Sequence, residues 1–421
     1  MFPLLFLPAL AAAAPAAPAA RQAQAPAIMP LSYKYGGYPK ISTDMVYGTP
    51  GQTPIETVVD TGSADFWVYG PDGKINSGSP YLFNTGPCTE DVTPFFNFPE
   101  SSTSTDVQTS SPRAYAYGGN GKIVQAPRSV NDTIAFTNPA YPPLLNQKVQ
   151  LANYTLIRSS ATTCNGMAYE RSILGMSPNT NTTSGPSFRG DLLATGRIES
   201  PTLSMWFDTP PANATGEFHG TALFGALPDS SKYSGPLVKV PLDPPAGTYV
   251  GYYVPLPEFS VGGAAFAVDA AATPRCLVDS GFGTENLPLA ADAFHAATGT
   301  VDSHGYPAWP GPCDSIPRNK TLDYTFAGVD GAKVTVRVPL RSYARGINDY
   351  YNETNVCALS LTLDSTGMCA VGAPFFTSAF LAFNDDKAEM GIAQGGVSSG
   401  AEKGVDGLGE VTVVKRGAGL P

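Results

Sequence analysis

Two copies of a short motif each place an aspartate after an apolar run, and these residues are the best suited to chemistry in the chain. Residues 58–63 read Val-Val-Asp-Thr-Gly-Ser, and residues 277–281 read Leu-Val-Asp-Ser-Gly. In each copy an apolar strand would deliver the aspartate to a fixed point, and the glycine would permit a tight turn with close backbone approach. Because the copies lie in halves of similar size, they indicate two related lobes that face each other.

Two carboxylates brought together in this way, Asp60 and Asp279, could activate a water molecule. Like charges about 3 Å apart cannot both ionise easily, so the pair would share one proton. The ionised carboxylate would take a proton from water while the protonated one hydrogen-bonds a peptide carbonyl. This chemistry needs no covalent intermediate, metal or cofactor, and it predicts peptide-bond hydrolysis in acid. Two Asx-type turns without a shared site are the alternative interpretation.

The rest of the chain indicates an all-β architecture around these motifs. From residue 33 onward, short apolar runs alternate with Gly, Pro, Asn and Ser, which predicts many strands joined by turns. An apolar-apolar-Gly triplet follows each motif, at 173–175 and at 370–372. Helical periodicity is confined to two short candidates, 201–207 and 290–297. With 421 residues the chain exceeds one ordinary core, so two β-rich lobes are expected.

Charge and motif content disfavour several other classes of protein. The net charge is −10 and no Lys/Arg-rich run occurs, so we expect no nucleic-acid partner. The three histidines form no His-Glu-x-x-His pattern and the six cysteines form no Cys-x-x-Cys pair, which disfavours a zinc protease or zinc ribbon. We therefore expect no metal site.

The ends of the chain and its glycosylation motifs predict a secreted, extracellular protein. Residues 1–20 are expected to be a signal peptide, with an unstructured Ala/Pro tail as the alternative. Residues 21–34 are expected to be a short leader or pro-segment, and residues 396–421 a flexible tail. No run of about 18 apolar residues follows the start, so no membrane anchor is expected. The sequons that fit a glycosylating secretory route are Asn131, Asn153, Asn181, Asn213, Asn319 and Asn352.

These motifs resemble those of the pepsin-like aspartic proteases, and the resemblance extends over most of residues 35–394. Residues 59–68, Val-Asp-Thr-Gly-Ser-Ala-Asp-Phe-Trp-Val, are similar to the family's first catalytic motif. The resemblance implies an aspartic-type endopeptidase with catalytic residues Asp60 and Asp279, protein or peptide substrates, and a monomer as the default. It also implies an all-β, bilobal pepsin-like acid protease fold with the cleft between the lobes. The implied lobes are 35–220 and 221–395.

The resemblance further implies which neighbours support the two aspartates. Thr61 and Ser280 would bridge the lobes and fix the pair. Ser63 would donate a hydrogen bond to the outer side of Asp60. The supporting residues of the two catalytic loops are Thr61, Gly62, Ser63, Ser280 and Gly281.

A flap that closes over the substrate is implied at Tyr117 and Gly118, with Tyr115 as the alternative tyrosine. Such a flap would exclude water from the reacting groups. Trp67 falls where the family has a tryptophan that braces the flap tyrosine. Simple packing of a strand tyrosine beside a glycine turn is the competing interpretation.

Six cysteines in a secreted chain favour up to three disulfides. By position, the resemblance implies a C-lobe disulfide between Cys313 and Cys357. Cys276 and Cys369 lie on strands that this fold would place close together, and either a disulfide or a pair of buried thiols fits them. The cysteines left by elimination are Cys88 and Cys164.

The second motif departs from the family pattern. Phe282 stands where the family has a hydroxyl that donates to the second aspartate, and loss of that donor is expected to raise the pKa of Asp279. Thr284 could supply the bond from a shifted loop. Glu285 and Asn286 replace an apolar pair and place polar groups where the core should close. Since both aspartates are present, an active acid endopeptidase is expected; a catalytically impaired pepsin-fold binding or inhibitor-like protein is the alternative.

Overall fold

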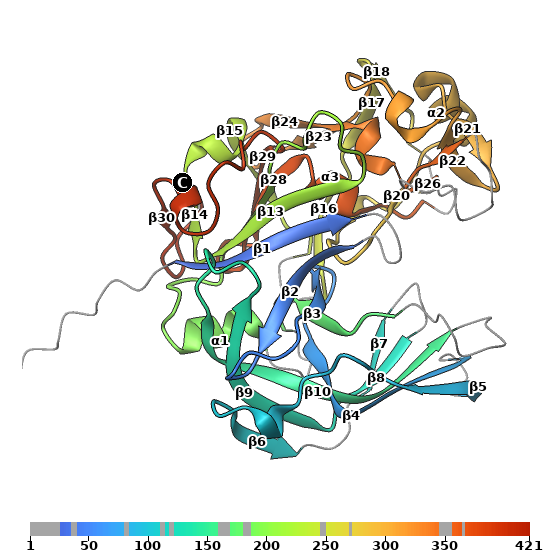
Figure 1. Ribbon diagram of the computed structural model, residues 1–421. Coiled ribbons are helices and arrows are strands. Elements are labelled where there is room, and N and C mark those ends of the chain that lie inside the picture. The colour runs from blue at the N-terminus through green and yellow to red at the C-terminus, as the bar shows by residue number, and fades with distance from the viewer. Residues whose placement is uncertain are drawn as a thin grey trace, which may run out of the picture.

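The structure, a computed structural model, has two strand-rich lobes joined by a shared sheet (Figure 1). In Figure 1 the lower lobe is built mainly from blue and green elements and the upper lobe mainly from yellow to red ones. The described residues are 26–34, 40–79, 84–109, 114–117, 122–158, 169–179, 187–244, 250–268, 272–344, 356–363 and 367–421.

The shared sheet contains 16 strands within the described residues. The antiparallel pairing of β1 with both β13 and β2 connects its two halves. Its path runs through β15 (Ser234–Pro241), β29 (Glu389–Gln394), β28 (Ala379–Asn384), β12 (Leu203–Phe207), β13 (Glu217–Phe224), β1 (Ala27–Lys34), β2 (Ile41–Tyr47), β3 (Ile55–Asp60), β11 (Ser172–Gly175), β4 (Phe66–Ser79), β10 (Leu144–Arg158), β8 (Lys122–Gln125) and β7 (Ala114–Tyr117). The strands beside this path are β5 (Asn84–Asp91), β6 (Thr105–Thr109) and β9 (Arg128–Phe136).

Smaller sheets complete the upper lobe. One follows the order β16 (Tyr252–Pro255), β19 (Arg275–Val278), β27 (Ala370–Val371), β20 (Glu285–Leu287) and β26 (Leu361–Leu363). The others are formed by β18 (Ala264–Ala265), β17 (Glu258–Val261), β23 (Thr321–Ala327) and β24 (Lys333–Pro339), by β21 (Val301–Ser303), β22 (Tyr306–Trp309) and β25 (Cys357–Ala358), and by β14 (Ala226–Leu227) and β30 (Thr412–Val413). The α-helices are short: α1 (Phe188–Ala194), α2 (Ala291–Thr298) and α3 (Ala373–Phe376). Within the described ranges, none combines the length and apolar character needed to cross a bilayer.

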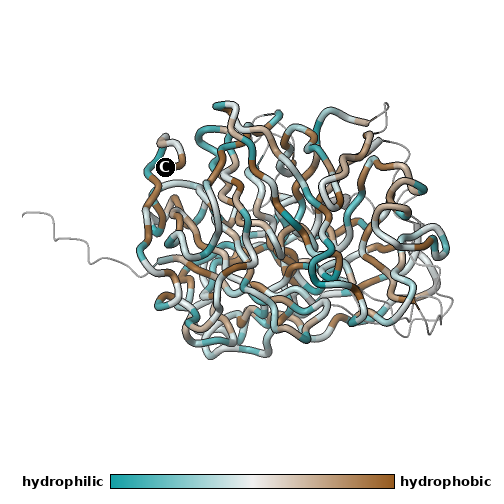
Figure 2. The backbone as a smooth tube through the Cα atoms, turned by 90° about the horizontal axis from the view of Figure 1, so that it is seen from above, coloured by the Kyte–Doolittle hydropathy of each residue, from teal (hydrophilic) through white to brown (hydrophobic). Residues whose placement is uncertain are grey.

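Side-chain patterns explain why these segments form strands. In β24, Val334, Val336 and Val338 are buried while their neighbours are more exposed, which is the alternation of a strand with one face on the core. β28 is an apolar run that is buried along its whole length, as expected of a strand covered on both faces. Figure 2 shows apolar and polar stretches interspersed along the backbone.

The internal repeat of the sequence is also a repeat of strand pairing. β3, which ends at Asp60, pairs in parallel with β11, and Gly175 is the register partner of Asp60. β19, which directly precedes Asp279, pairs in parallel with β27. Each aspartate motif therefore lies beside the apolar triplet of its own half.

One helix prediction is wrong and the other is confirmed. Residues 203–207 form β12 rather than a helix, because all five side chains are buried at the centre of the shared sheet between β13 and β28. The candidate at 290–297 corresponds to α2. Helix α1 was not predicted, although Ser187 caps its start by accepting a hydrogen bond from the Gly190 amide.

Both ends of the described chain depart from the expected boundaries. Residues 27–34 belong to the shared sheet as β1, whereas the sequence suggested a leader or pro-segment there. The expected flexible tail is instead packed against the upper lobe, because β30 pairs with β14 and the side chains of Leu408, Val414 and Leu420 are buried. The predicted boundary between residues 220 and 221 falls inside β13 and stays a prediction.

Candidate active site

The structure brings Asp60 and Asp279 together at the contact between the lobes. The Gly62 amide donates to Asp60 Oδ1 at 2.9 Å, and the Gly281 amide donates to Asp279 Oδ1 at 2.8 Å, so both turns use the same local contact. A β-carbon on Gly62 would lie 2.4 Å from Asp279 Cγ, and one on Gly281 would lie 2.3 Å from Asp60 Oδ1. Only glycine permits each turn to lie against the aspartate of the opposite lobe.

Thr61 and Ser280 form a reciprocal set of hydrogen bonds between the lobes. The Thr61 hydroxyl donates to the Val278 carbonyl at 2.9 Å and accepts from the Ser280 amide at 2.9 Å. The Ser280 hydroxyl donates to the Val59 carbonyl at 2.6 Å and accepts from the Thr61 amide at 3.0 Å. Both side chains are fully buried and fully satisfied, which fixes the two loops relative to each other.

The two carboxyl groups have different surroundings. Asp60 accepts a second hydrogen bond, at 2.5 Å, from the Ser63 hydroxyl to its Oδ2. Burial raises the pKa of Asp279 well above its ordinary value, and the charge and hydrogen bonding of Asp60 act in the same direction. The Gly281 amide and, more weakly, the charge of Lys40 oppose this increase. The geometry therefore favours Asp279 as the protonated member of the pair.

The missing hydroxyl after the second motif is not replaced. Phe282 contributes only its backbone here, donating to the Asp279 carbonyl at 3.2 Å and accepting from the Ala373 amide at 2.8 Å. The Thr284 hydroxyl points to the Glu285 carbonyl, at 3.5 Å, so the hypothesis that Thr284 reaches Asp279 is wrong. Among the described residues no hydroxyl donates to the Asp279 carboxyl, in agreement with its raised pKa.

Glu285 is completely buried, but its carboxyl group is well satisfied. The Tyr324 and Tyr343 hydroxyls donate to Oε2, the latter at 3.2 Å, and the Phe375 amide donates to Oε1 at 2.7 Å. Burial raises the pKa of Glu285 to about 8 in spite of these donors. The unusual polar residue therefore sits in the core of the upper lobe as a neutral acid at acidic pH. The neighbouring Asn286 accepts a hydrogen bond from Thr362 at 2.6 Å.

The implied flap is a β-hairpin in which Tyr117, at the end of β7, pairs with Lys122, at the start of β8. Gly118 and the Tyr117 side chain lie outside the described part of the structure, so the flap role stays a prediction. Trp67 lies in β4 with 2% of its surface exposed and packs edge-on against Tyr69 at 5.4 Å between ring centroids.

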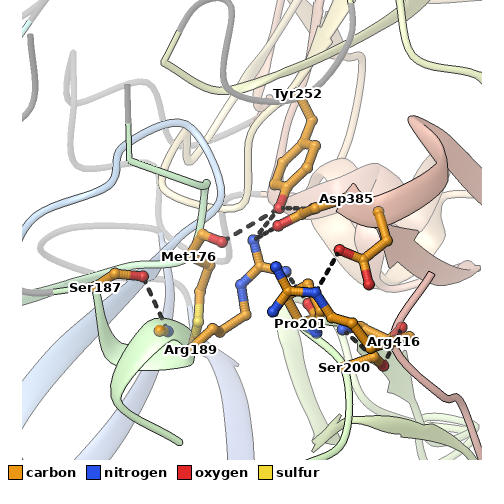
Figure 3. Close-up of polar contacts among 11 residues, drawn as sticks. Met176, Ser187, Arg189, Ser200, Pro201, Tyr252, Asp385 and Arg416 are labelled. Atoms are coloured by element: carbon orange, nitrogen blue, oxygen red, sulfur yellow. Dashed lines mark hydrogen bonds and ion pairs between the residues drawn. The ribbon is translucent and has the colours of Figure 1, made fainter. Parts of the chain in front are cut away.

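Arg189, Tyr252 and Asp385 form a buried network that sequence reasoning missed (Figure 3). Arg189 of α1 forms an ion pair with Asp385 at 2.7 Å and hydrogen-bonds Tyr252 of β16. The Tyr252 hydroxyl donates to Asp385 at 2.8 Å and also contacts the Met176 carbonyl, with 3.4 Å between the two oxygens. The Met176 amide donates to the Asp60 carbonyl at 2.7 Å, so the network connects the lobes directly behind the aspartate.

Two disulfides brace the upper lobe. The Cys313–Cys357 bond is the one that the resemblance implied, and Cys276 and Cys369 are likewise bonded rather than paired thiols. Cys88 is buried, and Cys164 lies outside the described residues, so their pairing stays a prediction.

Comparison with known proteins identifies the family. The family described as eukaryotic aspartyl protease matches residues 41–395. The chain belongs to this family. It is similar to aspartic proteinase yapsin-3 of Saccharomyces cerevisiae, with 24% identity over 377 residues that cover 86% of this chain and 67% of the yeast protein. The resemblance and the all-β, bilobal pepsin-like fold that it implied are therefore confirmed.

Proposed function

We propose that this aspartyl protease family member is a secreted endopeptidase that cleaves protein substrates at acidic pH with Asp60 and Asp279. The observation that carries the proposal is the mutual approach of the two carboxyl groups, with each motif glycine against the opposite aspartate. The bridging hydroxyls of Thr61 and Ser280 support a preorganised pair. Two disulfides support passage through an oxidising compartment.

In the proposed reaction, the ionised Asp60 takes a proton from a water molecule while the water oxygen bonds to the peptide carbonyl carbon. Protonated Asp279 gives its proton to the carbonyl oxygen. When the tetrahedral intermediate collapses, the carbon–nitrogen bond breaks and the nitrogen takes the proton held by Asp60. One of the two hydroxyl groups on the carbon gives its proton to Asp279 and becomes the carbonyl of the new carboxylic acid. The pair is then restored, and one water has been consumed.

The acidic working range follows from the shared proton. At very low pH both carboxyl groups hold protons, so no base is available. As the pH rises, Asp279 eventually gives up its proton and the general acid is lost. Its raised pKa moves this second limit upward. We therefore expect a bell-shaped dependence of hydrolysis on pH.

The alternative, a pepsin-fold binding protein without catalysis, draws its support from Phe282. The absence of a hydroxyl beside Asp279 removes one hydrogen bond to its charged form, but the proposed mechanism uses Asp279 in its protonated form. Phe282 therefore changes the pH range in which Asp60 and Asp279 work more than their ability to react, which favours an endopeptidase over a binding protein.

Hydrolysis of acid-denatured casein between about pH 2.5 and 7, with and without a statine-type inhibitor, tests the proposal. We expect a maximum in acid that the inhibitor abolishes, because a statine hydroxyl binds a carboxyl pair that shares one proton. Correctly folded protein that neither cleaves casein nor binds the inhibitor would establish the alternative.

A further inference from the structure

Three charged side chains that no motif singled out form a buried cluster, Lys40–Glu170–Lys122. The Lys40 ammonium group contacts Glu170 Oε1 and the Lys122 ammonium group contacts Oε2. The side chains of Lys40, Glu170 and Lys122 are only 15%, 3% and 6% exposed. Ion pairs buried to this degree escape most solvent screening, in contrast to surface pairs.

The cluster joins three segments that border the catalytic pair. Lys40 immediately precedes β2, and the amide of the next residue, Ile41, donates to the Ser280 carbonyl at 3.4 Å. Glu170 lies just before β11, whose last residue, Gly175, is the register partner of Asp60. Lys122 begins β8 and thus belongs to the hairpin implied as the flap.

The two lysines also act electrostatically on the pair. The positive charge of Lys40 lowers the pKa of Asp279, against the dominant effect of burial. Burial lowers the pKa of Lys122 to about 8, while the charges of Glu170 and, more weakly, Asp60 favour its protonated form. Burial raises the pKa of Glu170, but the two lysines outweigh this and lower it to about 2.

In acid the cluster therefore carries one net positive charge, two from the lysines and one negative from the glutamate. Further charged or titratable groups surround it, and they are the same residues in every variant compared below. These groups are Glu56 of β3, Tyr69 of β4, and Tyr169 and Arg171 on either side of Glu170.

We propose that Lys40, Glu170 and Lys122 are positioning residues for peptide hydrolysis, holding the β7–β8 hairpin to the segments that border the aspartate pair and setting, by their net positive charge, the pH range in which the pair works. This inference rests on the proposed function. It assigns no contact between the cluster and the reacting atoms. As a consequence, removing a positive charge from the cluster should move both the acidic and the alkaline limit of the pH profile to higher pH, and removing its negative charge should move both limits to lower pH.

Single and paired substitutions separate this electrostatic effect from simple loss of structure. Lys40→Met removes a positive charge, so both limits of the pH profile should move to higher pH by roughly half a unit. Glu170→Gln adds net positive charge and should move them to lower pH by a similar amount. The double variant restores the original net charge and should return the profile close to that of the wild type.

The controls are chosen within the same lobe. Lys40→Arg keeps the charge and should leave the limits in place. Lys74→Met removes a lysine from the exposed Lys74–Asp91 pair and should also leave them unchanged. If Glu170→Gln does not fold, the pH limits of Lys40→Met and Lys40→Arg can still be compared, and they show whether the charge of Lys40 matters.

The measurement is kcat/KM for a peptide substrate over the acidic pH range, with folding of each variant checked by circular dichroism. Limits that stay in place in Lys40→Met would overturn this inference while leaving the proposed function intact. Failure of the wild type to hydrolyse any substrate would overturn the proposed function, and the inference with it. Opposite shifts in the two single variants would establish the role of the cluster.

Discussion

Glu285 should make the fold less stable as the pH rises from acid toward neutrality. Burial raises the pKa of this carboxyl group from 4.5 to about 8. The unfolded chain releases the proton near pH 4.5, whereas the folded protein keeps it until about pH 8. The stability that neutral Glu285 supports is thus fully present below pH 4.5 and is lost progressively up to about pH 8.

The size of the effect follows from linkage. Each pH unit in this window removes about 1.4 kcal/mol from the free energy of unfolding. Over the whole window the loss amounts to about 5 kcal/mol, a large part of the stability of an ordinary domain. Glu285→Gln preserves an acceptor for the Phe375 amide and cannot ionise, so this part of the pH dependence should vanish.

The assay is urea unfolding at several pH values across the window, followed by circular dichroism. All samples carry Asp60→Asn, which we expect to prevent self-digestion. The quantity to compare is the difference in stability between proteins with and without the Glu285→Gln substitution, because other buried acids contribute equally to both. Glu258→Gln, in an exposed pair with Lys333, is the matched control. A difference that does not change with pH would refute the reasoning.

Three further predictions follow from the site. Ser280→Ala leaves the Thr61 amide and the Val59 carbonyl buried without their partner, so it should lower the free energy of unfolding by about 2–4 kcal/mol. It should also reduce kcat; urea unfolding measures the first effect and casein hydrolysis the second. Arg189→Met leaves Asp385 buried without its ion-pair partner and should cost about 3–5 kcal/mol, and a double variant with Asp385→Asn should recover part of this loss in the same unfolding assay. Phe282→Ser restores a donor to Asp279 and should lower its pKa, so the upper limit of the pH profile should move to lower pH; an unchanged limit would show that residue 282 does not act on the pair.

The approach of Asp60 and Asp279 could be predicted because the motif that carries each aspartate is encoded locally and twice. An apolar run, an aspartate and a glycine specify a strand and its turn without information from elsewhere in the chain. The repeat then implies that two such turns meet. The parallel pairing of β3 with β11 and of β19 with β27 gives the repeated triplets a structural meaning that spacing alone did not supply.

The rest of the site depends on contacts that spacing does not encode. Lys40, Lys122 and Glu170 are isolated charges in the sequence, and the Lys40–Glu170 pair is separated by 130 positions. The strand at 203–207 was mistaken for a helix because periodicity alone cannot distinguish a short, fully buried strand from a turn of buried helix. The hypothesis that Thr284 reaches Asp279 came from its position just after the second motif, whereas its hydroxyl points to the backbone carbonyl of Glu285.

The most direct test of the central claim is the rate of casein hydrolysis in acid by Asp60→Asn beside the surface control Asp44→Asn, which changes an exposed residue of β2. Both proteins must show the same folding transition as the wild type. The two-carboxyl mechanism predicts a loss of about 10³-fold or more for Asp60→Asn and an unchanged rate for the control. Full hydrolysis by the Asp60→Asn protein would contradict the mechanism.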